Sequence, residues 1–286
     1  MPGFSLAAAL LCCEHTGLYN RPLLEALPAL ALPAWVEHAA QINAATGLRR
    51  GKTDAVDARR IAAYAARYVD RARLYQAPRP VLAELGRLAA RRTRLTGVIH
   101  VLRPPLRSSA GFFSPAEQRA EVQGCAASLR AARADLKATD GAIAALIAGD
   151  DALARRYARI TSVPGVGPVT AVELLLPTNE FQDRDDPKRY ASYAGVVPFE
   201  RSTGQYKGRA RVSPQANKHV KTLLHLAALS AVRYSHHLKA YYERKVAEGK
   251  SKMLVLNNVH NKLVHLVFAC VRNDRNYDKN YAPALA

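Results

Sequence analysis

The segment from Pro80 to Asp150 constrains the fold of this chain most, because it is long, rich in Ala, Leu and Arg, and repeats its apolar residues at helical spacing. The recurring apolar residues are Leu82, Leu85, Leu88, Leu129, Leu136, Ile143, Leu146 and Ile147. Pro104-Pro105 and Gly111 interrupt the pattern near its middle. The pattern predicts a long antiparallel helical hairpin. Such an arm is either a dimerising or spacer element or an element that simply packs on the rest of the chain.

The residues before this arm predict a small α/β unit. Two short apolar runs, Leu6 to Cys13 and Leu32 to Val36, flank a helical stretch with Pro22 near its start. Thr53 is a suitable N-cap for a helix that continues to Tyr68. We therefore expect an α/β domain at residues 1–77.

The residues after the arm predict a mostly helical domain. Helical patterns cover residues 170–176, 188–194, 214–246 and 253–271. The expected organisation is thus an α/β unit at 1–77, a coiled-coil-like arm at 78–150 and a C-terminal domain at 151–286.

The charge balance indicates a polyanionic partner. Lys and Arg total 42 against 23 acidic residues, a formal net charge of +19, and such self-repulsion favours binding to nucleic acid. Residues 201–252 hold 12 Lys or Arg and two Glu, so the polyanion should lie there. No apolar run approaches the roughly 20 residues that span a bilayer, so we expect no membrane partner. The four cysteines have neither zinc nor disulfide spacing, which favours a cytoplasmic protein.

Three acidic residues form a candidate metal site. Asp54 and Asp57 are three residues apart at an expected helix start, so they share one face and could hold a divalent ion. The alternative is that both acids only complement the helix dipole. Glu14, at the end of an expected strand, favours the metal site, with His15 as a lining group and Lys52 near a bound phosphate.

A glycine-containing turn is the second candidate site. Pro164-Gly165-Val166-Gly167 precedes an apolar helical stretch, as in a helix-hairpin-helix turn, where glycines let backbone N–H groups approach a phosphate. A tight turn between helices with no ligand is the alternative.

The stretch from Glu200 to Ser213 is the third candidate site. It combines hydroxyls, glycines and basic side chains in an expected loop, followed by a helix capped by Ser213 with Pro214 at its first position. Either it binds phosphate, or Ser202 or Thr203 attacks DNA phosphorus. With the sites above, the nucleic-acid-binding candidates are Lys52, Gly165, Gly167, Arg201, Lys207, Arg209, Arg211, Lys218 and Lys221.

Several of these segments resemble the DEDD-type transposases of the IS-one-ten insertion-sequence family. Glu14-His15-Thr16-Gly17-Leu18-Tyr19 is similar to the family's E-x-T-G-x-Y, and Lys52-Thr53-Asp54-Ala55-Val56-Asp57-Ala58 is similar to its K-T-D-x-x-D-A. Val163 to Gly167, Tyr193 to Pro198 and Gly208 to Ala231 resemble landmarks of its C-terminal domain. The similarity spans nearly the whole chain and is least specific in the arm.

The resemblance implies a RuvC-like N-terminal domain, a serine-bearing C-terminal domain, and Mg²⁺-dependent excision and insertion of a DNA element. It also implies a structured bridge RNA that selects the DNA, and Glu14, Asp54 and Asp57 as three members of an acidic tetrad. The family's serine stands directly before a glycine, where this chain has Thr203, so Ser202 is the favoured nucleophile. Recombination of two duplexes implies a dimer or tetramer in the cytoplasm, associated with the nucleoid.

The chain departs from the family pattern at its start. The tetrad's first acid lies on an opening strand, but none of the 13 residues before Glu14 is Asp or Glu. The resemblance therefore implies a truncated RuvC-like unit with a weakened metal site. Two alternatives stay open: an inactive remnant that binds DNA or RNA without catalysis, and a structure-specific nuclease that uses the helix-hairpin-helix turn.

Overall fold

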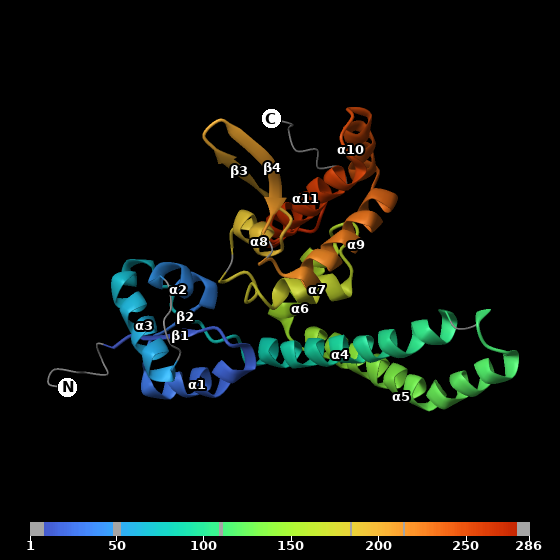
Figure 1. Ribbon diagram of the computed structural model, residues 1–286, viewed down its shortest axis with the longest axis horizontal. Coiled ribbons are helices and arrows are strands. Elements are labelled where there is room, and N and C mark those ends of the chain that lie inside the picture. The colour runs from blue at the N-terminus through green and yellow to red at the C-terminus, as the bar shows by residue number, and fades with distance from the viewer. Residues whose placement is uncertain (1–8, 48–52, 109–110, 184, 214, 279–286) are drawn as a thin grey trace. The chain divides into compact units, whose positions relative to one another are not determined.

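The computed structural model describes residues 9–47, 53–108, 111–183, 185–213 and 215–278. It is mostly helical with a few short strands. The chain divides into two compact units, residues 1–78 (unit 1) and 79–286 (unit 2), and each is described by itself (Figure 1). The finer division into three domains stays a prediction.

Unit 1 is built on a pair of parallel strands. β1 (Leu11–Glu14) pairs with β2 (Ala34–Glu37), and between them lie η2 (Gly17–Asn20), α1 (Arg21–Ala26) and η3 (Leu27–Leu30). This confirms the predicted order of strand, helix and strand. Then follow α2 (Ala39–Thr46), α3 (Asp54–Arg67) and η4 (Val69–Arg71). The segment of η2, α1 and η3 is the crossover connection between the two parallel strands. Parallel strands need a crossover because a tight hairpin can join only antiparallel strands.

The core of unit 1 is aromatic. Trp35 of β2 is 2% exposed and packs with Ile42, Tyr64 and Ala65 from the two following helices. The rings of Trp35 and Tyr64 lie 5.3 Å apart between centroids. Thr53 caps α3 as predicted, because its hydroxyl accepts a hydrogen bond from the Val56 amide at 3.3 Å. The cap and the ring contacts together fix where α3 begins and which face it buries.

The predicted arm is confirmed as a pair of long helices that lie side by side (Figure 1). α4 (Pro80–Ser108) and α5 (Pro115–Ala148) are bridged by an ion pair between Arg92 Nε and Asp140 Oδ1 at 2.7 Å. A capping box of Ser114 and Glu117 begins α5. The expected break at Pro104-Pro105 is wrong, because α4 continues to Ser108. Each proline removes one hydrogen bond to the carbonyl four residues before it, yet the helix continues through both.

A buried ion cluster anchors the base of the arm. Glu180 has a fully buried side chain and accepts hydrogen bonds from Arg79 Nε and Nη2, both at 2.7 Å. Arg79 Nη1 also donates to Asp150 Oδ2 at 2.8 Å, and Asp150 caps the next helix through the Leu153 amide. The Arg79 guanidinium holds the pKa of Asp150 down at about 2. The cluster therefore joins the start of α4, the end of α5 and the turn at Glu180.

The rest of unit 2 packs around one long helix. The elements are α6 (Asp151–Thr161), α7 (Pro168–Leu175), α8 (Pro187–Tyr193), β3 (Pro198–Thr203), β4 (Tyr206–Val212), α9 (Lys218–Tyr234), α10 (His236–Ala247) and α11 (Lys252–Arg272). α11 contacts α6, α8, α9 and α10 and buries residues such as Leu263 and Val264 completely.

α11 also corrects an expectation about apolar runs. By length and composition it is long and apolar enough to cross a membrane, although no such run was expected. Half of its apolar window is buried inside unit 2, as in the core helix of a globular domain. Two buried faces explain the composition, because neighbouring helices pack on α11 from more than one side.

Three further expectations for unit 2 are wrong. The stretch from Glu200 to Ser213 is not a loop, because most of it forms the antiparallel pair of β3 and β4, turning at Gly204 with φ +56°. The next helix starts at Lys218, and its cap is Asn217, whose side chain accepts from the His219 and Val220 amides, both at 3.1 Å. Asn217 satisfies two amides at once, so it displaces Ser213 from the predicted role. The expected helix at 214–246 is two helices separated at Ser235.

Candidate functional site

Glu14 lies at the carboxyl end of β1, where the sequence places it, and its register partner on β2 is another acid, Glu37. The turn after Glu14 is held by Asn20, whose amide donates to the Glu14 carbonyl at 2.8 Å and whose Oδ1 accepts from the Thr16 hydroxyl at 2.7 Å. His15 is exposed beside it. Two carboxylates therefore end two neighbouring strands.

Asp54 and Asp57 lie in the first turn of α3, as predicted. In the described part of the chain, no group of three His, Cys, Asp or Glu side chains is placed to hold a metal ion together, so the three acids do not form a joint ligand group there. α3 reaches the strand-end acids through Tyr64, which lies about 10 Å further along the helix than Asp57. The metal site of the three acids therefore stays a prediction. Lys52 lies outside the described residues.

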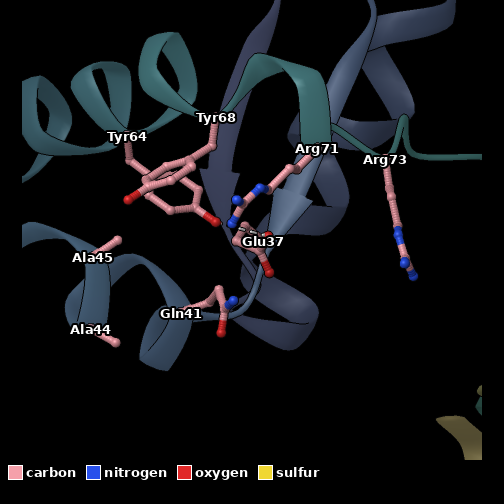
Figure 2. Close-up of a pocket in the computed structure, with 8 residues that line it drawn as sticks. All are labelled: Glu37, Gln41, Ala44, Ala45, Tyr64, Tyr68, Arg71 and Arg73. Carbon is pink, nitrogen blue, oxygen red and sulfur yellow. Dashed lines mark hydrogen bonds between the residues drawn. The ribbon is translucent and has the colours of Figure 1, made fainter.

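The end of β2 borders a pocket of about 510 Å³ (Figure 2). Its lining residues are Glu37, Gln41, Ala44, Ala45, Tyr64, Tyr68, Arg71 and Arg73. The Tyr64 hydroxyl donates to Glu37 Oε2 at 3.3 Å, and burial, followed by the Glu37 charge, raises the pKa of Tyr64. Sequence reasoning missed this pocket. A signal was present, because Glu37 directly follows the second apolar run just as Glu14 follows the first.

The glycines of the predicted helix-hairpin-helix turn have different surroundings. A Cβ added to Gly165, which has φ +85°, would lie 2.2 Å from the Ala227 carbonyl oxygen of α9. Gly165 is therefore needed for close packing of this turn against α9. A Cβ added to Gly167, the N-cap of α7, would have no atom within 4 Å. Only Gly167 is placed where a phosphate could approach the backbone.

Ser202 and Thr203 are both exposed on β3, close to the turn of the hairpin. Ser202 is the register partner of Lys207, and Thr203 that of Tyr206. Neighbouring residues of a strand point to opposite faces. The two hydroxyls therefore lie on opposite faces of the hairpin, and a phosphate bound on one face can meet only one of them.

The predicted basic residues gather on the hairpin and at the start of α9. Arg201 pairs with Gly208 and Arg211 with Phe199 in the strand register, and Arg209 and Lys207 lie on β4 between them. Lys218 begins α9 and is exposed, whereas Lys221 is half-buried one turn later. Four of the nine candidates, Arg201, Lys207, Arg209 and Arg211, thus lie on a single antiparallel ribbon. A two-stranded ribbon is an element that can follow a nucleic-acid groove.

Two family models match the chain. The model described as "Transposase IS116/IS110/IS902 family" matches residues 157–243. A second model, described as a transposase and covering DEDD-type IS110 transposases, matches residues 5–103. The matches include the hairpin and the acidic residues, and together they span more than half of the chain.

Relatives of this chain carry matching names. An insertion element IS116 protein of Streptomyces clavuligerus is 28% identical over 56% of this chain and 40% of its own length. An insertion element IS110 protein of Streptomyces coelicolor is 28% identical over 42% of this chain and 29% of its own. A pilin gene-inverting protein of Moraxella bovis is 27% identical over 44% of this chain and 40% of its own length. The matched stretches span less than half of each of these relatives. The chain belongs to the IS110 family of transposases.

Proposed function

We propose that this chain acts in the excision and insertion of a DNA element, with Ser202 as the nucleophile. The observation that carries the proposal is the exposed position of Ser202 on a basic hairpin inside the matched transposase region. A relative named as a gene-inverting protein supports the same class of reaction, because inversion also breaks and rejoins DNA.

The chemistry assigned to Ser202 is a phosphoryl transfer. Its Oγ forms a bond to a DNA phosphorus and gives up its proton to solvent, while the bond from phosphorus to one deoxyribose oxygen breaks and that oxygen takes up a proton. Arg211, further along β4, supplies positive charge to the hairpin that holds Ser202. Rejoining is the reverse attack by a deoxyribose hydroxyl of another strand.

Dependence on a divalent metal is general for DEDD transposases. We retain Mg²⁺, with Glu14, Asp54 and Asp57 as its proposed ligands. The described residues do not bring these three carboxylates into one ligand group, so no chemical step is assigned to the ion here. The proposed RuvC-like origin of unit 1 rests on the order of strand, helix and strand together with these acids.

The proposed partners are DNA, a structured guide RNA and further copies of this chain, acting in the cytoplasm at the nucleoid. The arm supports the proposed contact with further copies of this chain, because its far end exposes Val101 and Phe112, which are 72% and 88% accessible to solvent. The turn before α7 is proposed to contact a phosphate through the Gly167 backbone, in the manner of a helix-hairpin-helix.

A second candidate function is nucleic-acid binding without catalysis. It is favoured by the absence of a three-ligand metal group among the described residues, because a basic protein without an assembled metal site still binds phosphates. The two functions differ in one product, the covalent link between Ser202 and DNA.

The test combines the full chain with DNA carrying the ends of its own element, the neighbouring non-coding RNA, and either Mg²⁺ or a chelator. We expect recombinant junctions with Mg²⁺, and a DNA-linked peptide containing Ser202 by mass spectrometry. Ser202→Ala should abolish both, whereas Ser213→Ala, outside the hairpin strands, should retain them. Loss of the junctions and of the DNA-linked peptide in Thr203→Ala, with full activity in Ser202→Ala, would identify Thr203, on the other face of the hairpin, as the nucleophile. Binding without any covalent link or junction would favour the second candidate.

A further inference from the structure

The pocket at the strand ends of unit 1 has no part in the reaction assigned to Ser202. It lies where ligands bind in open α/β folds, outside the carboxyl ends of parallel strands. Glu37 ends β2, α2 contributes Gln41, and α3 contributes Tyr64 and Tyr68. The volume of about 510 Å³ is in the range of small-molecule sites.

The segment after α3 completes one wall of this pocket. The Tyr75 amide donates to the Ala34 carbonyl at 2.6 Å, and Leu74 bridges to Trp35. These backbone contacts run the segment along β2 and so place Arg71 and Arg73 beside the pocket. Figure 2 shows Arg71 reaching toward Glu37, whereas Arg73 points away from the other lining residues.

Arg71 lies over the ring of Tyr68 in a cation–π stack, and the ring of Tyr64 is tilted against that of Tyr68. The rings of Tyr64 and Tyr68 lie 5.1 Å apart, and the Arg71 guanidinium carbon lies 5.2 Å from the centre of the Tyr68 ring. Arg71 is also 3.8 Å from Asp70, but both side chains are more than two thirds exposed, so this ion pair contributes little. A flat ligand can extend such a stack on the guanidinium plane.

The charges of the pocket limit what that flat ligand can be. Glu37 is half-buried and, as a carboxylate, accepts hydrogen bonds only. Arg71 donates beside it, and Arg73 adds an exposed positive charge at the rim. The complementary molecule has a planar body with a donor next to an acceptor, and an anionic end. A nucleotide has both parts.

We propose that this pocket binds one unpaired nucleotide, with its base on the stack of Tyr68 and Arg71 and its phosphate near Arg73. The inference rests on the proposed function, which supplies the nucleic acid. A paired base is excluded, because its faces are covered by its neighbours in the duplex. Guanine fits best, since its Watson–Crick edge has a ring N–H and an amino group side by side for the Glu37 carboxylate and a carbonyl acceptor for Arg71, whereas each of the other three bases offers Glu37 a single nitrogen donor on that edge.

Trp35 makes the pocket observable in the full chain. It is the only tryptophan of the sequence, it is buried, and its ring contacts that of Tyr64, which lines the pocket. A base that stacks in the pocket should therefore change Trp35 fluorescence. Binding to the basic hairpin of unit 2 alone would raise the anisotropy of a labelled oligonucleotide without that local change.

The experiment titrates the full chain with labelled single strands of thymidine that carry one central cytosine, guanine, adenine or thymine. We expect guanine to bind at least about five-fold more tightly than thymine, the size expected for one stacked and hydrogen-bonded base, with a matching change in Trp35 fluorescence. Arg71→Ala and Glu37→Gln should abolish both effects. Arg59→Ala, which removes an exposed arginine of α3 outside the pocket, should retain them.

RNA versions of the same strands identify the source, because a response to RNA alone or to DNA alone assigns the pocket to that nucleic acid, and a response to both assigns it to either. Equal affinity for the four bases with constant Trp35 fluorescence overturns the inference, and so does equal binding of a duplex. Anisotropy changes that persist in that case leave the proposed function intact. Its own failure is the absence of recombination and of the Ser202 adduct.

Discussion

Single buried residues in unit 2 couple its stability to pH. His260 of α11 is 3% exposed, and its Nε2 lies 3.2 Å from Nδ1 of His225 on α9. Burial, with the neighbouring charges of His225 and Lys221, lowers the pKa of His260 to about 4. His260 is therefore neutral in the folded protein at pH 7. The unfolded state binds a proton at this side chain more readily, so a falling pH favours unfolding.

We predict an acid destabilisation that His260 causes. Its folded pKa is below its unfolded value of about 6.5, so its contribution is complete above pH 6.5 and is lost as the pH falls toward 4. The loss should reach about 3 kcal/mol in the free energy of unfolding. Urea unfolding followed by circular dichroism at several pH values measures it. His260→Gln should flatten this pH dependence, and exposed His237→Gln should leave it unchanged; equal slopes in both variants would contradict the assignment.

At the scale of elements, the ion cluster of Arg79, Asp150 and Glu180 holds the arm to the rest of unit 2. Glu180 has no exposed side-chain surface, and its other cationic neighbour, Arg156, is 3.4 Å away. Without Arg79, a buried carboxylate would keep only that longer contact. Loss of one partner of a buried pair is far more costly than loss of an exposed pair.

We predict that Arg79→Ala lowers the free energy of unfolding of unit 2 by about 3 kcal/mol, the lower end for a buried pair because the Arg79 side chain is 37% exposed. Arg87→Ala, which removes an exposed pair with Glu84 in the same helix, should cost less than about 1 kcal/mol. Circular dichroism follows unit 2, while Trp35 fluorescence follows unit 1 and should not change. Similar losses of unfolding free energy in both variants would show that the cluster stabilises unit 2 no more than an exposed ion pair does.

The far end of the arm exposes more apolar surface than a solvated helix pair needs. We define the arm tip as Val98, Val101, Phe112, Phe113 and Val122, all of which are more than 40% exposed. Exposed apolar residues in such a group are typical of interaction surfaces. The proposed contact between copies of this chain would cover them.

We predict that Phe112→Ser with Phe113→Ser shifts the protein to smaller assemblies, because two aromatic side chains are lost from the contact. Sedimentation equilibrium measures the mass. Val69→Ser, an exposed apolar residue of unit 1, is the control. An unchanged mass in the double variant would remove the arm tip from assembly, and circular dichroism checks that the helices remain.

At the scale of the whole molecule, charge is divided unevenly between the units. Unit 1 has 9 Lys or Arg against 6 Asp or Glu, and unit 2 has 33 against 17. Electrostatic attraction to a nucleic acid backbone should therefore come mainly from unit 2, while unit 1 contributes the more selective pocket. The slope of log affinity against log salt concentration is proportional to the number of phosphates that the protein contacts.

We predict that Lys218→Ala lowers the slope of log affinity against log salt for a DNA duplex by about 0.9, the value of one phosphate contact. Lys218 is exposed at the start of α9, next to the hairpin in sequence. Arg59→Ala in unit 1 should leave the slope unchanged. Anisotropy titrations over a range of salt concentrations give both slopes, and the reverse result would place the duplex on unit 1.

Local patterns in the sequence determined most of the elements of this protein. The arm, the strand, helix and strand of unit 1, the Thr53 cap and α11 all follow from residues within a few positions of one another, because helical and strand periodicity is a local property. Motif similarity likewise identified the family before any contact was known. Where local signals competed, as with Ser213 and Asn217, the sequence-based choice was wrong.

Only the tertiary structure decided which distant residues meet. It matched Glu14 with Glu37 in the strand register and set Gly165 against the backbone of α9. It also brought Glu37, Tyr68 and Arg71 to one pocket, although no sequence spacing joins them. The physical reason is that such contacts depend on strand register and on how whole helix faces pack, and these are fixed by many buried side chains together rather than by any one motif.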